Sequence, residues 1–244
     1  MTRESRKIAV IGAGNVGATC AFVMAERKLG EIVLLDIYEG FAKGKALDMS
    51  QGGQVLNYDG NITGTSKYED IAGADVVVVT SGFPRQPGMS REDLIGKNAE
   101  IISQVGTGIR DFAPDSIVIM VTNPLDLMTY HMQKVTGFEA NRVIGQAGIL
   151  DSARMTHFVS QAVGCSNEDV QAMVLGGHGD TMVPLPRYTT VGGIPITQLL
   201  DSDEIDAISK RTASGGGEIV KLLERGSAFY APGSAAAIMA ESVL

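Results

Sequence analysis

A glycine-rich turn near the start of the chain constrains the fold more than any other feature. Gly12, Gly14 and Gly17 form a G-x-G-x-x-G run that follows the apolar segment Lys7–Ile11 and opens a segment of helical character. Asp36 ends the next apolar segment. A strand, a glycine turn, a helix and a second strand that ends in a carboxylate form the context in which this run binds a dinucleotide. The sequence therefore predicts a parallel α/β domain with a dinucleotide site at its start.

Each residue of this turn has a predicted role. Gly12 permits a sharp turn, Gly14 lets a pyrophosphate approach the backbone, and Gly17 lets the helix pack closely on the sheet. The N-terminus of the helix offers N–H groups and positive potential to the phosphates. Asp36 would accept hydrogen bonds from the adenosine ribose and would repel a 2′-phosphate, which favours NAD over NADP. The alternative is a structural turn with a surface carboxylate nearby.

The first half of the chain alternates strand and helix signals. The segments Val76–Thr80 and Ser116–Val121 are apolar without alternation, which indicates strands buried on both faces of a parallel sheet. Further strands are predicted at Lys7–Ile11, Glu31–Asp36 and Arg142–Ile144, and helices from the glycine turn to about Leu29 and near Gly40–Gln51, Asp93–Arg110 and Leu125–Val135. This alternation predicts a Rossmann-type doubly wound sheet over residues 1–145.

The second half, residues 146–244, changes character and predicts an α+β domain. A helix near Leu150–Val163 precedes a strand at Val170–Leu175, and Arg187–Val191 with Ile194–Ile196 predicts an antiparallel hairpin. Helical signals return from Asp203 to Leu223, where the three glycines at 215–217 are expected to bend or break the helix.

Charge and composition exclude several classes of function. The net charge is −8 and no cluster of lysine and arginine opposes it, which argues against nucleic acid or an anionic membrane as partner. Cys20 and Cys165 form no CxxC pair and no metal-spaced group, so we expect reduced thiols, a cytoplasmic protein and no metal site. The uncharged run Ile8–Ala25 divides into strand, turn and helix, which argues against a signal peptide or a membrane span.

One histidine has the setting of an acid–base catalyst. His178 follows a predicted strand and is flanked by glycines in the sequence Gly-Gly-His-Gly-Asp, so ligand atoms could approach its ring. A histidine titrates near neutral pH and can therefore donate a proton in one direction of a reaction and accept it in the other. The alternative is a hydrogen-bonded structural histidine. His131 and His157 lie inside predicted helices, and we expect them to be surface or packed residues.

Five motifs together resemble one family. The glycine turn, Thr80–Leu94, Val121–Pro124, Gly148–Arg154 and Gly176–Pro184 are similar, in order and spacing, to the lactate/malate dehydrogenase family, and in particular to its malate dehydrogenases of the lactate-dehydrogenase-like kind. The resemblance extends over the whole chain. It implies reversible hydride transfer between NAD and malate or oxaloacetate, and a homo-oligomer, dimeric or tetrameric.

The resemblance also implies roles for individual residues. Asp151 would hold the His178 ring in one tautomer, and Arg154 would bind the substrate carboxylate with two parallel bonds. From the residues alone, Asp151 and Arg154 could equally form an ordinary helical ion pair, since they lie three positions apart. Arg91 would polarise the substrate carbonyl. Further contacts to cofactor or substrate are implied for Asn15, Val16, Asn98, Val121 and Asn123.

Arg85 is expected to decide the substrate. It lies in the segment Gly82–Ser90, whose glycines and prolines are typical of an active-site lid. The resemblance places it where the lactate enzymes have glutamine and the malate enzymes arginine, and Met89 where the lactate enzymes have an acidic residue. A second substrate carboxylate would meet Arg85, whereas pyruvate would leave its charge buried and unpaired. A lactate or other 2-hydroxyacid dehydrogenase remains the alternative.

The resemblance finally implies that members of the family extend beyond the position of Leu244. We therefore expect the second domain to be C-terminally incomplete in this sequence, and this chain to be less stable than a longer relative. An NAD-binding fragment without turnover is a further alternative. A mechanism like that of the zinc alcohol dehydrogenases is not supported, because the sequence offers no Cys/His cluster for the metal.

Overall fold

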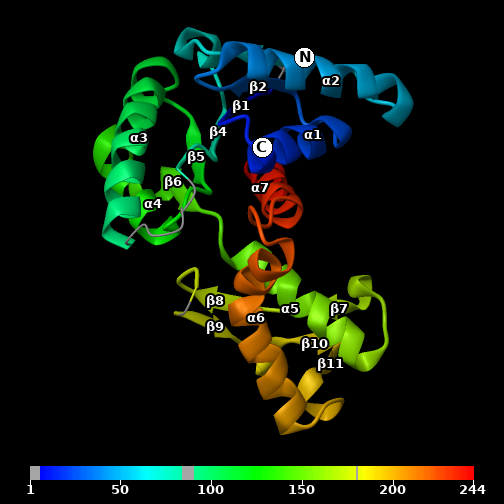
Figure 1. Ribbon diagram of the computed structural model, residues 1–244. Coiled ribbons are helices and arrows are strands. Elements are labelled where there is room, and N and C mark those ends of the chain that lie inside the picture. Colours follow the sequence, from blue (N-terminus) through cyan, green and yellow to red (C-terminus); the bar gives the residue numbers. More distant parts are fainter. Residues whose placement is uncertain (1–5, 84–90, 180) are drawn as a thin grey trace. The chain divides into compact units, whose positions relative to one another are not determined.

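The computed structural model describes residues 6–83, 91–179 and 181–244. The chain divides into two compact units (Figure 1). The first comprises Met1–Gln146 together with Phe229–Leu244, and the second comprises Ala147–Ala228.

A six-stranded parallel sheet forms the centre of the first unit. Its strand order is β3-β2-β1-β4-β5-β6. The strands are β1 (Lys7–Ile11), β2 (Glu31–Leu35), β3 (Ile62–Thr65), β4 (Val76–Val79), β5 (Ile117–Met120) and β6 (Val143–Gly145). All four valines of β4 are fully buried, as its unalternated sequence predicts. The predicted doubly wound fold is confirmed, and the order reverses between β1 and β4, where such sheets bind their ligands.

Helices cover both faces of this sheet. Figure 1 shows α1, α2 and α7 over one face and α3 and α4 over the other. Their bounds are α1 (Asn15–Glu26), α2 (Glu39–Leu56), α3 (Arg91–Phe112), α4 (Leu125–Thr136) and α7 (Tyr230–Val243). Each of the first four lies within a few residues of the predicted helix.

One strand of the sheet was not predicted from the sequence. Strand β3 has the sequence Ile-Thr-Gly-Thr and pairs in parallel with β2, at the edge of the sheet. Its single large apolar side chain gives no apolar run. Gly64 is needed because a Cβ there would lie 2.4 Å from the carbonyl carbon of Ala42 in α2. Contact with α2, rather than local strand propensity, therefore fixes this segment.

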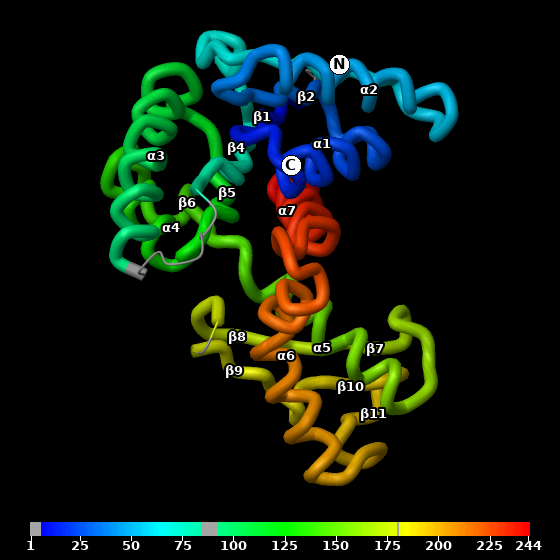
Figure 2. The backbone as a smooth tube through the Cα atoms, in the orientation of Figure 1, coloured from blue at the N-terminus to red at the C-terminus, as the bar shows by residue number. Residues whose placement is uncertain are grey.

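The last helix belongs to the first unit, although the predicted division at residue 145 assigned it to the second domain. Helix α7 packs against α1, although the two helices are far apart in the sequence (Figure 2). The side chains of Arg27 and Glu241, which more than two hundred residues of chain separate, form an ion pair at 2.6 Å. Ala236, Ala237 and Ala240 are fully buried in the core of the first unit. Residues 229–244 were expected in the second domain, because the sequence of an alanine-rich helix does not indicate which helix it packs against.

The second unit combines two long helices with short antiparallel strands. Its elements are α5 (Gly148–Val163), β7 (Val170–Gln171), β8 (Val174–Gly176), β9 (Met182–Pro184), β10 (Thr190–Val191), β11 (Ile194–Pro195) and α6 (Ser202–Leu223). The predicted hairpin is present as β10 and β11, which join β7 in one sheet, while β8 pairs with β9 in another.

Two details of the second unit were predicted wrongly. The expected strand Val170–Leu175 is divided between β7 and β8, which belong to different sheets. The expected break at Gly215–Gly217 does not occur, because α6 continues from Ser202 to Leu223. Asp201 begins this helix with a reciprocal capping box to Glu204.

None of the helices in the described part of the chain is long and apolar enough to cross a membrane. Cys20 and Cys165 are free thiols, and burial raises the pKa of Cys20 to about 12.

Candidate active site

The glycine turn lies where the order of the parallel sheet reverses. Gly12 has a φ of +106°, and a Cβ on it would lie 2.7 Å from the backbone nitrogen of Ser81, which follows β4. A Cβ on Gly17 would lie 1.9 Å from the carbonyl oxygen of Gly12. Both positions therefore require glycine, one for its backbone angle and both for close packing.

The space beside Gly14 fits a pyrophosphate. A Cβ there would meet nothing within 4 Å, and no side chain caps the N-terminus of α1, where Asn15 and Val16 begin the helix. Free N–H groups and the positive end of the helix suit an anion. Ser81 Oγ is buried and has no hydrogen-bond partner among the described residues, so a polar group is available where the sheet order reverses. The sequence analysis had missed this hydroxyl.

The Asp36 carboxylate is fixed by the glycine turn itself. Oδ2 accepts a hydrogen bond from the backbone nitrogen of Ala13 at 2.8 Å, and Oδ1 accepts one from that of Tyr38 at 3.1 Å. The half-buried side chain therefore joins the end of β2 to the turn after β1. An ionised carboxylate oxygen accepts more than one hydrogen bond, so Asp36 retains capacity for a ribose hydroxyl.

Asn98 joins the chain segments that follow β4 and β5. Its side chain is 2% exposed; Oδ1 accepts from the nitrogen of Phe83 at 2.6 Å, and Nδ2 donates to the carbonyl oxygen of Asn123 at 2.7 Å. Val121 continues the backbone pairing of β5 by donating to the carbonyl of Val79 at 2.9 Å. Asn98 and Asn123 are thus brought together, and the Asn98 side chain connects the two segments.

Two arginines of the predicted site fall outside what the structure describes. Arg85 and Met89 lie outside the described residues. Arg91 is the first residue of α3, but its side chain also lies outside the described part of the chain.

The second unit brings His178, Asp151 and Arg154 together. His178 Nδ1 lies 3.0 Å from Asp151 Oδ2, and Arg154 Nη1 donates to Asp151 Oδ1 at 3.1 Å. The side chain of Asp151 is 2% exposed, against 19% for His178 and 14% for Arg154. One buried carboxylate therefore serves both partners. The helical ion pair and the histidine–carboxylate pair, which the sequence presented as alternative interpretations, coexist.

The backbone around this cluster is held by a residue that sequence analysis did not single out. Ser152 Oγ, next to Asp151 on α5, accepts a hydrogen bond from the backbone nitrogen of Val174 at 3.0 Å. Val174 begins β8, the strand that leads to His178. The bond therefore fixes the distance between the helix that carries Asp151 and the strand that carries the histidine loop.

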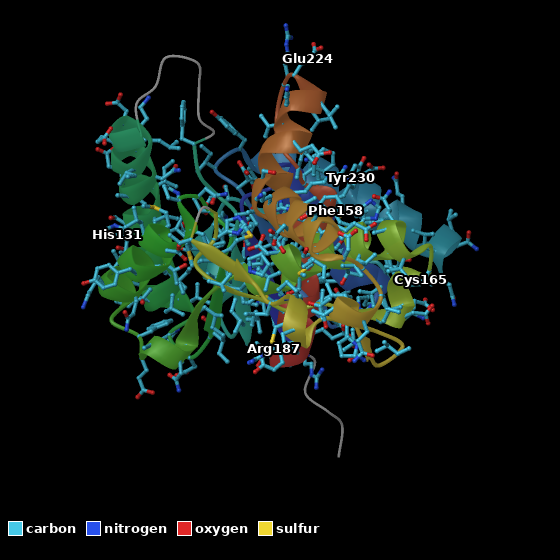
Figure 3. The ribbon with its side chains drawn as sticks, turned by 90° about the horizontal axis from the view of Figure 1, so that it is seen from below. His131, Phe158, Cys165, Arg187, Glu224 and Tyr230 are labelled. Atoms are coloured by element: carbon cyan, nitrogen blue, oxygen red, sulfur yellow. The ribbon has the colours of Figure 1, made fainter. Side chains whose placement is uncertain are left out.

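The other two histidines lie elsewhere. His131 is half-buried on α4, and its Nε2 lies 2.8 Å from Ser103 Oγ and 3.1 Å from the carbonyl oxygen of Ala99 on α3 (Figure 3). This is a contact between two helices. His157 is exposed on α5. Among the described residues, no group of three or more histidine, cysteine or acidic side chains could hold a metal ion.

The fold and these two sets of residues define a class of protein. A glycine turn with a carboxylate at the end of the next strand is typical of a dinucleotide-binding oxidoreductase, and a histidine–aspartate pair beside an arginine suits proton transfer on an anionic substrate.

Comparison with known proteins identifies the family. Residues 6–145 match the family model of the lactate/malate dehydrogenase NAD binding domain, and residues 149–244 match that of the lactate/malate dehydrogenase alpha/beta C-terminal domain. The chain belongs to the lactate/malate dehydrogenase family, whose members are NAD-dependent oxidoreductases, and within it to the malate dehydrogenases of the lactate-dehydrogenase-like kind. The resemblance drawn from the motifs is confirmed.

Individual relatives agree with this assignment. A malate dehydrogenase of Methanosarcina barkeri is 56% identical over 98% of this chain and 78% of its own length. The structure of the apo malate dehydrogenase from Picrophilus torridus is similar with a TM-score of 0.93 and 49% identity, over 98% of this chain and 75% of that one. The lactate dehydrogenase from Eimeria maxima, solved with NADH and oxamate, has a TM-score of 0.92 and 39% identity, over 99% and 75% of the two chains.

Proposed function

We propose that this chain catalyses the reversible transfer of hydride between NAD and the malate/oxaloacetate pair. The observation that carries the proposal is the cluster of His178 and Arg154 on the buried carboxylate of Asp151. It supplies a proton and a carboxylate-binding cation, the two groups that reduction of a 2-keto acid needs besides a hydride donor. We also propose that residues 1–145 carry the cofactor site and residues 146–244 the substrate site, as the spans of the two family matches favour.

His178 acts as the acid–base group. Its Nδ1 faces Asp151, which leaves Nε2 for the substrate oxygen. When bound, NADH would supply the hydride for the reduction of oxaloacetate at its keto carbon. His178 gives the proton of Nε2 to the oxygen, and the C=O becomes CH–OH. In the reverse direction the same nitrogen accepts the hydroxyl proton. Asp151 stabilises the charged ring and keeps it oriented.

Arg154 binds the carboxylate next to the keto carbon. Its Nη1 is already committed to Asp151, so the remaining N–H groups of the planar guanidinium are available for paired bonds to the substrate. Asn123 would contact the substrate and orient the nicotinamide. Arg91 would polarise the keto oxygen, and Arg85 would bind the second carboxylate, the group that separates oxaloacetate from pyruvate.

Oxidation of NADH, followed by its absorbance with oxaloacetate and with pyruvate, tests the proposal. We expect rapid turnover of oxaloacetate and little of pyruvate. An Arg85→Gln variant should shift the preference toward pyruvate because it removes the cation for the second carboxylate. A wild-type preference for pyruvate would show a lactate-type enzyme. Binding of NADH without turnover of either acid would refute catalysis by this chain.

We further propose a homo-oligomer, dimeric or tetrameric. Helix α2 carries several large apolar side chains on its exposed surface, with Leu47 61% and Val55 81% exposed, and Phe41 48% and Leu56 43% exposed. A patch of this kind is typical of a subunit interface. Light scattering after gel filtration measures the oligomeric state, and a monomer throughout the concentration range would refute the proposal.

The two free cysteines support a cytoplasmic location as a further proposal. Fractionation of cells that express the chain tests it, and recovery outside the cytoplasmic fraction would refute it.

A further inference from the structure

Helix α6 contains three consecutive glycines in its fourth and fifth turns, at positions 215–217. Glycine weakens a helix because it loses more conformational entropy on folding than any other residue. A run of three glycines should therefore interrupt a helix. The helix nevertheless continues through them to Leu223. Helical conformation does not require glycine at any of these positions, but a contact with a neighbouring side chain can.

The three glycines differ in what a side chain would meet. A Cβ on Gly215 would lie 3.1 Å from Arg154 Cδ, which is closer than an ordinary carbon–carbon contact. A Cβ on Gly216 would lie 3.4 Å from Arg154 Nη2. A Cβ on Gly217 would meet nothing within 4 Å. Gly215 is buried, Gly216 is half-buried and Gly217 is exposed, so the run turns from the arginine to solvent within three residues.

Arg154 is therefore confined by two helices. Asp151, one turn earlier on α5, accepts the bond from Nη1, and the bare backbone of α6 lies against Cδ and Nη2. We propose that Gly215 and Gly216 form a seat for the Arg154 side chain and act as positioning residues for the substrate carboxylate. The inference rests on the proposed role of Arg154 in binding that carboxylate. We call these two residues the glycine seat.

An ion pair braces the same stretch of α6. Arg211 donates from Nε to Glu218 Oε2 at 3.0 Å and from Nη2 to Oε1 at 2.8 Å. This bidentate ion pair joins a residue before the glycine run to a residue after it. The Arg211 guanidinium also lies 4.2 Å from the centre of the Phe158 ring on α5. An ion pair thus spans the glycine segment, and a cation–π contact connects it to the helix that carries Arg154.

Single alanine substitutions test the glycine seat. Gly215→Ala should displace Arg154 by a few tenths of an ångström and raise the KM for oxaloacetate about three- to tenfold, since small misplacements of a binding group are costly. Gly216→Ala should do so more weakly. Gly217→Ala is the matched control, with the same chemical change on the same helix, and should leave KM unchanged. The KM for NADH should not change in any of the three.

A double-mutant cycle with Arg154→Lys separates positioning from general damage to the fold. If Gly215 acts through the guanidinium, Gly215→Ala should raise KM in the wild type but add nothing in the Arg154→Lys background. Equal effects in both backgrounds would overturn the inference. Titration of the enzyme–NADH complex with malonate, a dicarboxylate that cannot be reduced, gives the same comparison without turnover.

The outcomes distinguish this inference from the function on which it rests. If Arg154→Lys leaves both oxaloacetate KM and malonate affinity unchanged, the proposed role of Arg154 is refuted. If Arg154→Lys weakens both and Gly215→Ala weakens neither, only the glycine seat is refuted. Should Gly215→Ala fail to fold, the comparison of Gly216→Ala with Gly217→Ala decides, and identical KM values for those two would overturn the inference.

Discussion

His178 Nδ1 and Asp151 Oδ2 lie 3.0 Å apart, and the carboxylate is almost entirely shielded from water. Burial of an ionised carboxylate is costly unless charged or polar partners meet both oxygens. Here the imidazole meets one oxygen and Arg154 meets the other. The pair therefore depends on the arginine for its charge balance, and the arginine depends on Asp151 for its orientation.

Replacement of Asp151 by asparagine should lower kcat for oxaloacetate reduction by about a hundredfold or more, the usual range for an acid–base group. The amide can offer its N–H group to the ring and so favour the wrong tautomer. The KM for oxaloacetate should rise as well, because Arg154 loses its charged partner. Steady-state kinetics measure both quantities. Asp169→Asn, at an exposed position of the same unit, is the control and should behave as the wild type.

Replacement of Asp36 should change the choice of cofactor. Asp36→Ala removes the negative charge and both oxygens that accept from the Ala13 and Tyr38 N–H groups, whereas Asp36→Asn removes the charge and keeps one acceptor oxygen. We expect the ratio of NADPH to NADH dissociation constants to fall about tenfold or more in both variants, a difference of about 1.4 kcal/mol. Fluorescence titration measures the constants. An unchanged ratio would contradict the role of Asp36.

A substitution at Gly233 tests the attachment of α7 to the first unit. A Cβ there would lie 2.8 Å from the Thr19 Cβ and 2.9 Å from the carbonyl oxygen of Val16, so Gly233→Ala should lower the free energy of unfolding by about 1–3 kcal/mol. Gly44→Ala, in α2, is the control because a Cβ there meets nothing within 4 Å; it should be neutral or stabilising. Urea unfolding measures both.

The Arg211–Glu218 pair should make stability depend on pH at the acidic end. The bidentate hydrogen bond from Arg211 lowers the pKa of the Glu218 carboxyl below its ordinary value of 4.5. The native state therefore favours the charged form. The contribution to stability is complete above about pH 4.5 and is lost as the pH falls through the lowered pKa. The pair is exposed, so its contribution is small and screened by salt.

The variant Glu218→Gln should accordingly unfold at a lower urea concentration than the wild type near neutral pH, and the difference should vanish well below pH 4.5. Glu168→Gln, which removes another exposed carboxylate of the same unit, is the matched comparison. A difference between Glu218→Gln and the wild type that persists in acid would indicate an effect of the side chain other than its charge.

Much of the first unit was predictable because its signals are local. The valines of β4 and the spacing of Gly12, Gly14 and Gly17 specify buried strands and a sharp turn without knowledge of distant residues. Strand β3 was missed because its conformation depends on α2 lying against Gly64. The position of α7 could not be predicted for the same reason. Its alanines can pack closely against any helix and do not indicate that the partner is α1.

The candidate site shows the same division between local and distant information. The sequence motif indicated His178, and the resemblance assigned it Asp151 as partner. The structure adds that Asp151 bonds to Arg154 at the same time. The glycine run at 215–217 predicted a bend or break in the helix, because the sequence does not show that the Arg154 side chain lies against Gly215. A glycine that would weaken an isolated helix can be required where a second helix lies close to it, and only the three-dimensional structure shows that contact.

The pairing of α7 with α1 has a consequence for the order in which the protein is made. The ribosome completes residues 6–146 of the first unit, then the whole of Ala147–Ala228, and only afterwards the alanines that fill the core beside α1. During synthesis, the apolar surface that α7 later covers in the first unit therefore stays exposed until the whole second unit has been made. Such an intermediate exposes a ready site for aggregation or for a chaperone.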